Sequence, residues 1–160
     1  MKSTCLLLLL ALGALAAQAQ AIHTADVPPT VRAALERHFA GAKAVEWSQG
    51  GGGYEAEFKL RGAEVEAVFS REGTLLETET EIAVGKLPPA IRTTLKLNFP
   101  AYRLDEAARL ERGGKTYYVV EAEAGDTETE FTFLPDGTLI AQETETDDDD
   151  ADKDEGSDPR

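Results

Sequence analysis

Apolar and charged residues alternate along four segments of the chain, which is the pattern of antiparallel strands with one buried face. Residues 54–60 and 63–69 form the first two segments, with glutamates in the phase opposite to the apolar residues. Residues 118–124 and 127–133 form the other two. Only two residues, one of them glycine, separate the segments of each pair. We therefore expect two hairpins closed by two-residue turns.

A segment with helical periodicity precedes each hairpin. In the first, one helix face at i, i+3, i+4, i+7 and i+8 consists of Val31, Ala34, Leu35, His38 and Phe39. In the second, the same spacing is occupied by Ile91, Thr94, Leu95, Asn98 and Phe99. Prolines stand in the first turn, where a helix tolerates a residue without an N–H. We expect each helix to lie on its sheet through this face, with His38 in a structural role at the buried edge.

The chain contains an internal repeat. Residues 27–35 return as residues 87–95, a shift of 60, whereas Gly73-Thr74-Leu75 returns as Gly137-Thr138-Leu139, a shift of 64. The second copy has therefore gained four residues between its helix and its second strand. Two copies are too few for a solenoid, so we interpret the chain as a duplicated domain. The expected fold class is α+β, a tandem duplication of a helix plus four-stranded antiparallel sheet unit.

The two ends of the chain have the composition of segments outside the fold. Residues 1–21 combine Lys2, a short apolar run and two small-x-small sites, the pattern of a secretory signal peptide. The mature chain is expected to begin at Gln20 or Ile22. Residues 144–160 are acidic and of low complexity, and we expect this tail to be disordered. The tandem domain lies between these ends at residues 22–143, with repeat 1 at 27–82 and repeat 2 at 87–143.

Composition and charge argue against several classes of function. A formal net charge of −14 disfavours nucleic acid and anionic membrane surfaces as partners, because phosphate binding needs clustered Lys and Arg. Cys5 is the single cysteine and lies in the signal peptide, so the mature chain has no disulfide and no thiolate. The sequence has no nucleophile elbow, phosphate loop or zinc-protease motif. We expect no enzyme, no cofactor, no catalytic or metal-binding residues, and no membrane insertion after signal cleavage.

Several short sequences in the first copy resemble the PepSY-like family, also described as β-lactamase-inhibitor-like. They are the helix ending in Phe39, then Ala44-Val45-Glu46-Trp47, Tyr54-Glu55-Ala56-Glu57-Phe58 and Gly73-Thr74-Leu75-Leu76-Glu77. The resemblance covers nearly all of residues 27–143. It implies a helix-plus-four-strand module in tandem, like the β-lactamase inhibitor protein, in a secreted or periplasmic protein. Trp47, which shares the strand phase of Val45 and is expected to be buried, has no tryptophan counterpart in the second copy.

The glutamates that alternate with the core residues are expected to line one side of the sheet. The residues that we predict to form a partner-binding face there are Glu57, Glu66, Tyr117, Val119, Glu121, Glu123, Glu128 and Glu130. Two-residue turns place four pairs opposite one another: Glu57 with Glu66, Glu121 with Glu130, Glu123 with Glu128, and Lys59 with Glu64. Tyr117 and Val119 either contact a partner or pack against the neighbouring half. The acidic face is either a solvated, aggregation-resistant surface or a surface shaped for a basic partner or a divalent cation.

These observations predict an exported, non-enzymatic protein-binding module that acts in the periplasm or outside the cell, with a basic protein as its partner. The namesake inhibitor of the resembled family grips an enzyme with an extended sheet face. Inhibition of a secreted or periplasmic enzyme is therefore the first activity to test. The alternative is a low-affinity divalent-cation-binding envelope protein, which calcium should stabilise. An enzyme would require a well-ordered pocket with convergent polar groups.

Overall fold

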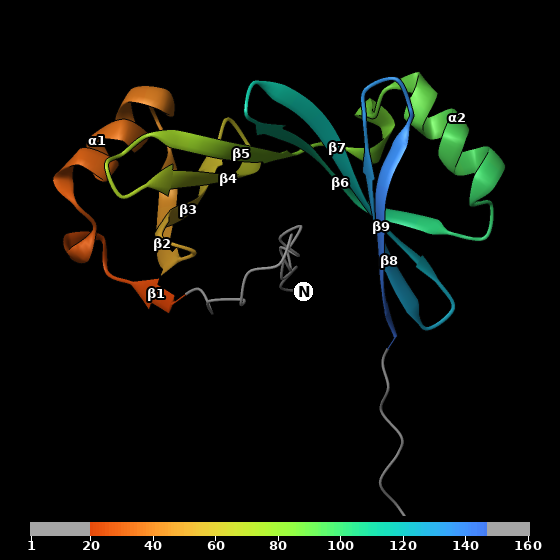
Figure 1. Ribbon diagram of the computed structural model, residues 1–160, viewed down its shortest axis with the longest axis horizontal. Helices are drawn as coiled ribbons and strands as arrows, with labels where there is room; N and C mark the ends of the chain where they lie inside the picture. Colours follow the sequence, from red (N-terminus) through yellow and green to blue (C-terminus); the bar gives the residue numbers. More distant parts are fainter. Residues whose placement is uncertain (1–19, 147–160) are drawn as a thin grey trace, which may run out of the picture. The chain divides into compact units, whose positions relative to one another are not determined.

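The computed structural model describes residues 20–146, which form two α-helices, two short 3₁₀ helices and nine strands. The chain divides into two compact units, the first ending at Thr78 and the second beginning at Glu79. Each unit contains one α-helix and an antiparallel sheet (Figure 1). The predicted α+β fold class is therefore confirmed. No helix within residues 20–146 is long and apolar enough to cross a bilayer.

The first unit consists of a short edge strand, a helix and four further strands. Its elements are β1 (Gln20–Ile22), η1 (Thr24–Asp26), α1 (Pro29–His38), β2 (Lys43–Gly50), β3 (Gly53–Leu60), β4 (Ala63–Ser70) and the first part of β5 (Leu75–Glu81), inside which the boundary between the units falls. Neighbouring strands follow the chain order from β1 to β5. Leu60 pairs with Ala63 across the turn between β3 and β4, which confirms the two-residue hairpin predicted there.

The second unit repeats the helix and the four strands. Its elements are η2 (Val84–Lys86), α2 (Pro89–Asn98), β6 (Arg103–Arg112), β7 (Lys115–Ala124), β8 (Thr127–Phe133) and β9 (Leu139–Thr146). The strands lie in chain order from β6 to β9 and all neighbouring pairs are antiparallel. Ala124 pairs with Thr127, so the second two-residue hairpin is also confirmed.

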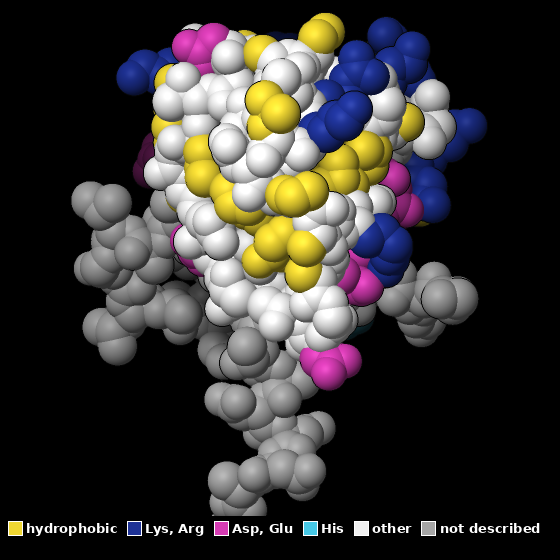
Figure 2. All heavy atoms as spheres, turned by 90° about the vertical axis from the view of Figure 1, so that its right-hand side faces the viewer, with side chains coloured by type: hydrophobic (Ala, Val, Ile, Leu, Met, Phe, Trp, Pro, Cys, Tyr) yellow, Lys and Arg dark blue, Asp and Glu magenta, His cyan; other side chains and the backbone are white. Residues whose placement is uncertain are grey.

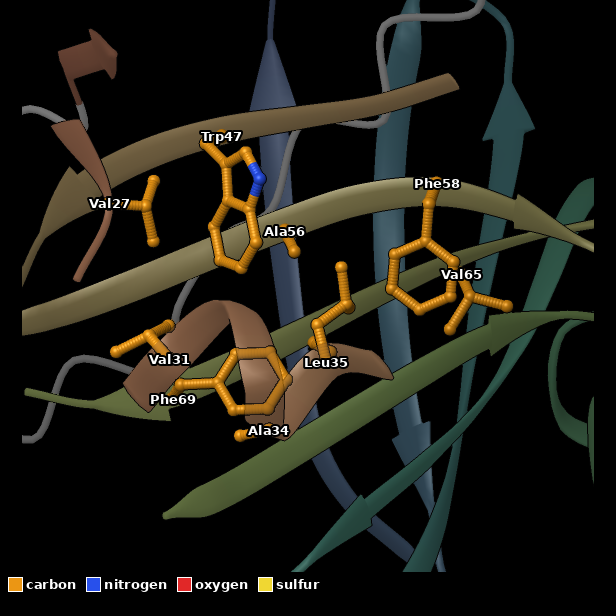
Figure 3. Close-up of a cluster of buried hydrophobic side chains, with 10 residues drawn as sticks. Val27, Val31, Ala34, Leu35, Trp47, Ala56, Phe58, Val65 and Phe69 are labelled. Atoms are coloured by element: carbon orange, nitrogen blue, oxygen red, sulfur yellow. The ribbon is translucent and has the colours of Figure 1, made fainter. Parts of the chain in front are cut away.

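The core of the first unit lies between α1 and the sheet. Val31, Ala34 and Leu35 of the helix are buried against the strand residues whose alternation predicted this face. Trp47 of β2 is buried as expected and lies beside Val27 and Ala56 in Figure 3. Its ring centroid is 6.2 Å from that of Phe69. The apolar phase of every strand is thus covered by one helix, and burial of these side chains is the main stabilising contribution.

The second unit fills the equivalent space with a different arrangement of volumes. In the first unit one row across the sheet reads Trp47, Ala56, Ala67, and the matching row of the second unit reads Ala107, Val120, Phe131. The large aromatic side chain has therefore moved from the first strand of the row to the third. Phe131 contacts the ring of Phe99 at a centroid separation of 4.6 Å. The missing tryptophan is compensated within the same row, because a close-packed core tolerates exchanges that keep the total volume.

The repeated Gly-Thr-Leu motif brings a tight turn against the first turn of each helix. Gly73 and Gly137 both have φ of +87°. A Cβ atom at Gly137 would lie 2.9 Å from the carbonyl carbon and oxygen of Ala90, and one at Gly73 would lie 2.8 Å from the carbonyl oxygen of Thr30. Thr94 in addition donates its hydroxyl proton to the carbonyl of Gly137 at 3.0 Å. Only glycine meets both the positive φ and the close approach to the helix.

The four additional residues of the second copy lengthen one hairpin. The strands β2 and β3 have eight residues each, whereas β6 and β7 have ten each, and both hairpins turn through two residues. The insertion therefore adds two residues to each strand, with Arg112 pairing with Lys115 at the tip. The sequence located this insertion correctly between the helix and the second strand of the hairpin.

Both ends of the tandem domain reach farther than the sequence predicted. Gln20 and Ala21, which precede the predicted domain start at residue 22, lie in β1 and pair with β2. Thr144 to Thr146, which we assigned to the disordered tail, lie in β9 and pair with β8. These short polar stretches lack an apolar phase, so only the neighbouring strand makes them extended. Residues 1–19 and 147–160, which include the rest of the predicted signal peptide and tail, are outside the described residues.

Two further expectations need correction. His38, the last residue of α1, is exposed rather than set at a buried edge, whereas Phe39, the next residue, packs against the core. Ile82, placed at the end of repeat 1, belongs to the second unit and packs against the core beneath α2. The sequence repeat begins at the helix, whereas the structural unit begins in the strand before it.

The contact between the glycine turn and the helix can be tested by adding a single methyl group. Gly137→Ala should destabilise the protein by about 2–4 kcal/mol, because the new Cβ combines an unfavourable positive φ with a backbone clash. Gly114→Ala is the matched control, since Gly114 also has positive φ (+73°) but has open space around it. That control should cost about 1–2 kcal/mol. Urea unfolding measures both, and equal losses would contradict the proposed close approach.

Because β9 extends to Thr146, we expect a chain that ends before Thr144 to be less stable than a chain that ends after it. The hydroxyl oxygen of Thr144 lies 3.1 Å from that of the fully buried Thr129. A chain ending at Glu143 should lose about 0.5–1.5 kcal/mol of unfolding free energy, because the buried hydroxyl of Thr129 loses one of its two partners and keeps only its 3.5 Å hydrogen bond to the hydroxyl of Tyr102. A chain ending at Thr146 should melt within a few degrees of the full-length protein. Thermal melts of both chains decide this, and a large loss in the longer one would show that residues 147–160 contribute to folding.

Candidate functional site

A row of four glutamates crosses the sheet of the second unit on the side opposite to α2. Glu106 pairs with Glu121, Glu121 with Glu130, and Glu130 with Glu143, so β6, β7, β8 and β9 each contribute one side chain. All four side chains are half-buried. We call this set the second glutamate row. Like charges at directly opposed positions repel, at a cost of about 0.2–1 kcal/mol for each pair.

The first unit carries a shorter version, the first glutamate row. Glu46 pairs with Glu57 and Glu57 with Glu66, across β2, β3 and β4. Nearby, the pKa of Glu55 is raised by its own burial and by the carboxylate of Glu57. The predicted pairing of Glu57 with Glu66, Glu121 with Glu130, and Glu123 with Glu128 is confirmed. Both units thus present carboxylates on the side of the sheet that the helix leaves open.

Glu121 is the most perturbed carboxyl group of the site. Its pKa is raised from 4.5 to about 7, first by burial and then by the neighbouring carboxylates of Glu106, Glu128, Glu79 and Asp105. A carboxyl group that is half-buried among four others holds a proton more tightly, since the proton removes one of the repelling charges. Around neutral pH the side chain is therefore shared between its neutral and charged forms.

Two cations offset part of the acidic face. Lys59 contacts Glu64 at 2.9 Å, which confirms the predicted pair. Arg103 at the start of β6 forms ion pairs with Asp105 and Glu123. Because these pairs are largely exposed, each contributes little to stability. Arg103 neutralises part of the negative charge at the end of the site near Glu123.

Tyr117 and Val119 lie in the same strand phase as the glutamates, as predicted, but they are not equivalent. Val119 is 8% exposed and forms a small apolar cluster with Ala108 and Leu110. Tyr117 is half-buried at the edge of this cluster. Val119 is therefore a packing residue, and Tyr117 is the one of the two whose side chain is partly accessible to a partner. The cluster occurs only in the longer hairpin, because the first copy has Glu55 and Gly53 in these positions.

The arrangement of the carboxylates differs from that of a metal site. Among residues 20–146, no group of three or more His, Cys, Asp or Glu side chains is arranged to hold a metal ion. Cross-strand glutamates lie in a line along the sheet and do not converge on one point, as oxygen ligands of calcium must. A line of carboxylates with an adjoining Tyr117 suits an extended basic segment.

Three members of the two rows were missed from the sequence: Glu46, Glu106 and Glu143. Glu46 and Glu106 lie beside register shifts in β2 and β6, where a bulge breaks the alternation that would have placed them. Glu143 lies in β9, whose residues we assigned partly to the tail. The signal that could have found them is the spacing from each turn, once an extra bulge residue is allowed in the first strand.

The family comparison matches most of the chain. The family model described as "Putative beta-lactamase-inhibitor-like, PepSY-like" matches residues 14–77 and again residues 52–141. Two overlapping matches are consistent with two copies of the unit. No curated protein matches this sequence.

Solved structures from Bacteroides species have the same fold. A "BLIP-like protein" from Bacteroides fragilis is 30% identical, with a TM-score of 0.66 over 79% of this chain and 93% of its own. A "DUF2874 family protein" from Bacteroides uniformis is 20% identical, with a TM-score of 0.69 over 73% and 88% of the two chains. A protein from Bacteroides eggerthii described among "putative periplasmic proteins" is 17% identical, with a TM-score of 0.70 over 74% and 88%. None of the three is described as an enzyme.

The raised pKa of Glu121 predicts a pH-dependent stability. A carboxyl whose pKa is raised on folding contributes most to stability below about pH 4.5, and the contribution is lost as the pH rises through about 7. Glu121→Gln removes this loss, so it should stabilise the protein by about 0.5–1 kcal/mol at pH 8 and low salt. At pH 5 or in high salt the gain should shrink. Thermal melts from pH 5 to pH 8 measure it.

Glu36→Gln on α1 is the control for this experiment, because Glu36 is exposed and lies outside both rows. It should change the melting temperature equally little at both pH values. A loss of stability in Glu121→Gln at pH 8 would mean that Glu121 makes favourable contacts that outweigh the repulsion within the row.

Proposed function

The chain belongs to the PepSY-like family, and from this premise we propose that it is an exported, non-enzymatic protein-binding module whose acidic sheet face contacts a basic partner. The observation that carries the proposal is the second glutamate row. Four strands each place one glutamate opposite another, although the mutual repulsion works against folding. A face that is costly to keep in the free protein is expected where a partner neutralises it.

The partner that this face would select is a protein segment with spaced Lys or Arg side chains. Arginine is favoured, because its planar guanidinium forms paired hydrogen bonds with a carboxylate. Tyr117, at the edge of the apolar cluster, supplies an aromatic surface next to the charges. Such an arrangement raises the association rate more than it adds affinity, since opposite potentials steer the encounter.

Inhibition of a secreted or periplasmic enzyme is the form of binding that we propose to test first. It is supported by the family description and by the BLIP-like relative at 30% identity. Export is supported by the predicted signal sequence and by the relative described as periplasmic. The residues proposed to contact the partner are Glu57, Glu66, Tyr117, Glu121, Glu123, Glu128 and Glu130, together with Glu46, Glu106 and Glu143.

A pull-down from the native envelope, with the mature protein as bait, should recover the partner. The double variant Glu121→Gln with Glu130→Gln should then bind it with an association rate roughly tenfold slower at low salt, and the difference should narrow at high salt. Dissociation should change less. Surface plasmon resonance measures the association and dissociation rates, and the melting temperature of the variant confirms that it remains folded.

Glu36→Gln with Glu72→Gln is the matched control, since it removes the same charge from exposed positions outside the face. This control should bind like the unaltered protein. If the two double variants slow association equally, net charge alone governs the rate, and the glutamate rows are not the contact surface.

A further inference from the structure

The exposed side of α2 differs from the rest of this acidic protein. Residues 82–104 contain four Lys and Arg residues and no Asp or Glu, in a chain of net charge −14. Arg92 and Lys96 are both exposed and lie one turn apart on the helix. In Figure 2, which faces the right-hand side of Figure 1, dark-blue Lys and Arg side chains gather beside yellow hydrophobic ones. Basic charge is therefore concentrated locally against the overall balance.

An exposed leucine adjoins these cations. Leu97 is 71% exposed, the largest exposure among the large hydrophobic side chains of the described residues. Thr93, one turn before it, donates its hydroxyl proton to the carbonyl of Pro89 at 2.9 Å, so this hydroxyl is satisfied within the helix. At 100° per residue, Arg92, Lys96, Thr93 and Leu97 occupy one continuous arc. We call this arc the α2 patch.

The first copy shows that the α2 patch is not required by the fold. The helices α1 and α2 have matching bounds at a shift of 60, so Arg92 corresponds to Arg32, Lys96 to Glu36, and Leu97 to Arg37. The three positions carry a formal charge of +1 in the first copy, from Arg32, Glu36 and Arg37, and of +2 in the second. The second copy has exchanged an acid for a base and a base for a leucine. A lysine in the last turn of a helix has a stabilising role towards the helix dipole. No such account applies to an exposed leucine.

We propose that the α2 patch is a second docking surface, which takes an acidic peptide segment carrying an apolar side chain from a partner protein. Carboxylates of the segment would contact Arg92 and Lys96, and its apolar side chain would cover Leu97. Charge complementarity selects this occupant, because a basic partner would be repelled here and drawn to the glutamate rows on the other side of the sheet. The surface is independent of the proposed function, which uses the open side of the sheet.

The chain's own acidic residues 147–160 are the competing occupant. They carry the required charge but no large apolar residue, since Ala151 is the only hydrophobic residue among them. A segment without an apolar side chain leaves Leu97 uncovered, so the tail accounts for the basic half of the α2 patch and not for the leucine. A segment of a partner protein therefore fits the α2 patch better than the tail does.

The experiment is a titration of the ¹⁵N-labelled mature full-length protein with a synthetic twelve-residue peptide of Glu, Asp and Leu. It is run at about 0.15 M salt, where the Debye length is about 8 Å. The distant acidic residues are then screened, and the peptide responds mainly to Arg92 and Lys96. Amide shifts should change along α2 and not along α1. The double variant Lys96→Glu with Leu97→Arg, which restores the first-copy residues, should weaken binding at least tenfold while leaving the melting temperature unchanged.

The converse variant tests whether the α2 patch is sufficient. Glu36→Lys with Arg37→Leu transfers it to α1, which should then bind the same peptide. A peptide with Ser in place of Leu should bind at least several-fold more weakly. Absence of shifts on α2 at millimolar peptide, or equal binding by the Lys96→Glu, Leu97→Arg variant, would overturn the proposal. The last comparison is between a chain ending at Thr146 and the full-length protein, both without peptide. If removal of residues 147–160 alone changes the amide shifts of α2, the tail occupies the α2 patch and the proposal is overturned.

Discussion

The structure of each unit depends on one ten-residue helix that covers one face of an antiparallel sheet. The main core of each unit lies on that face, and the two-residue turns keep the register in which the alternating apolar residues reach it. A shift of one residue would turn the apolar side chains to solvent and bring the glutamates beneath the helix. The contact of Gly73 and Gly137 with the helix starts holds the far end of the sheet against the same helix. Packing and register therefore support each other.

The acidic face is a direct consequence of this arrangement. Strict alternation sends the residues between the core positions to the open side, and in both units many of these are glutamates. Antiparallel pairing then aligns them in rows across the strands, where their charges repel. The pKa of Glu121 is raised first by its burial and then by neighbouring carboxylates, among them Glu106 of the same row. The basic partner that we propose would relieve that repulsion.

Comparison of the two copies separates what the fold requires from what it permits. The glycine turns, the helix bounds and the buried helix positions are kept in both. The aromatic side chain of the core row has moved from Trp47 to Phe131, and the hairpin has lengthened. The outer helix face has lost its acid and one arginine, and carries a lysine and a leucine in their place. These changes preserve the core volume and alter the surface, which gives the second unit an acidic side and a basic side.

The sequence by itself determined the helices, the two short hairpins, the buried tryptophan and the pairing of Glu121 with Glu130, because periodicity and turn length are local properties of the chain. It did not determine that Gln20 and Thr144 lie in strands, because polar end segments become extended only when a neighbouring strand offers hydrogen bonds. The bulges that bring Glu46 and Glu106 into the rows likewise appear only in the paired strands. Only the tertiary structure decided that Val119 is buried while Tyr117 is partly exposed, since both share one strand phase and burial depends on what packs beside each residue.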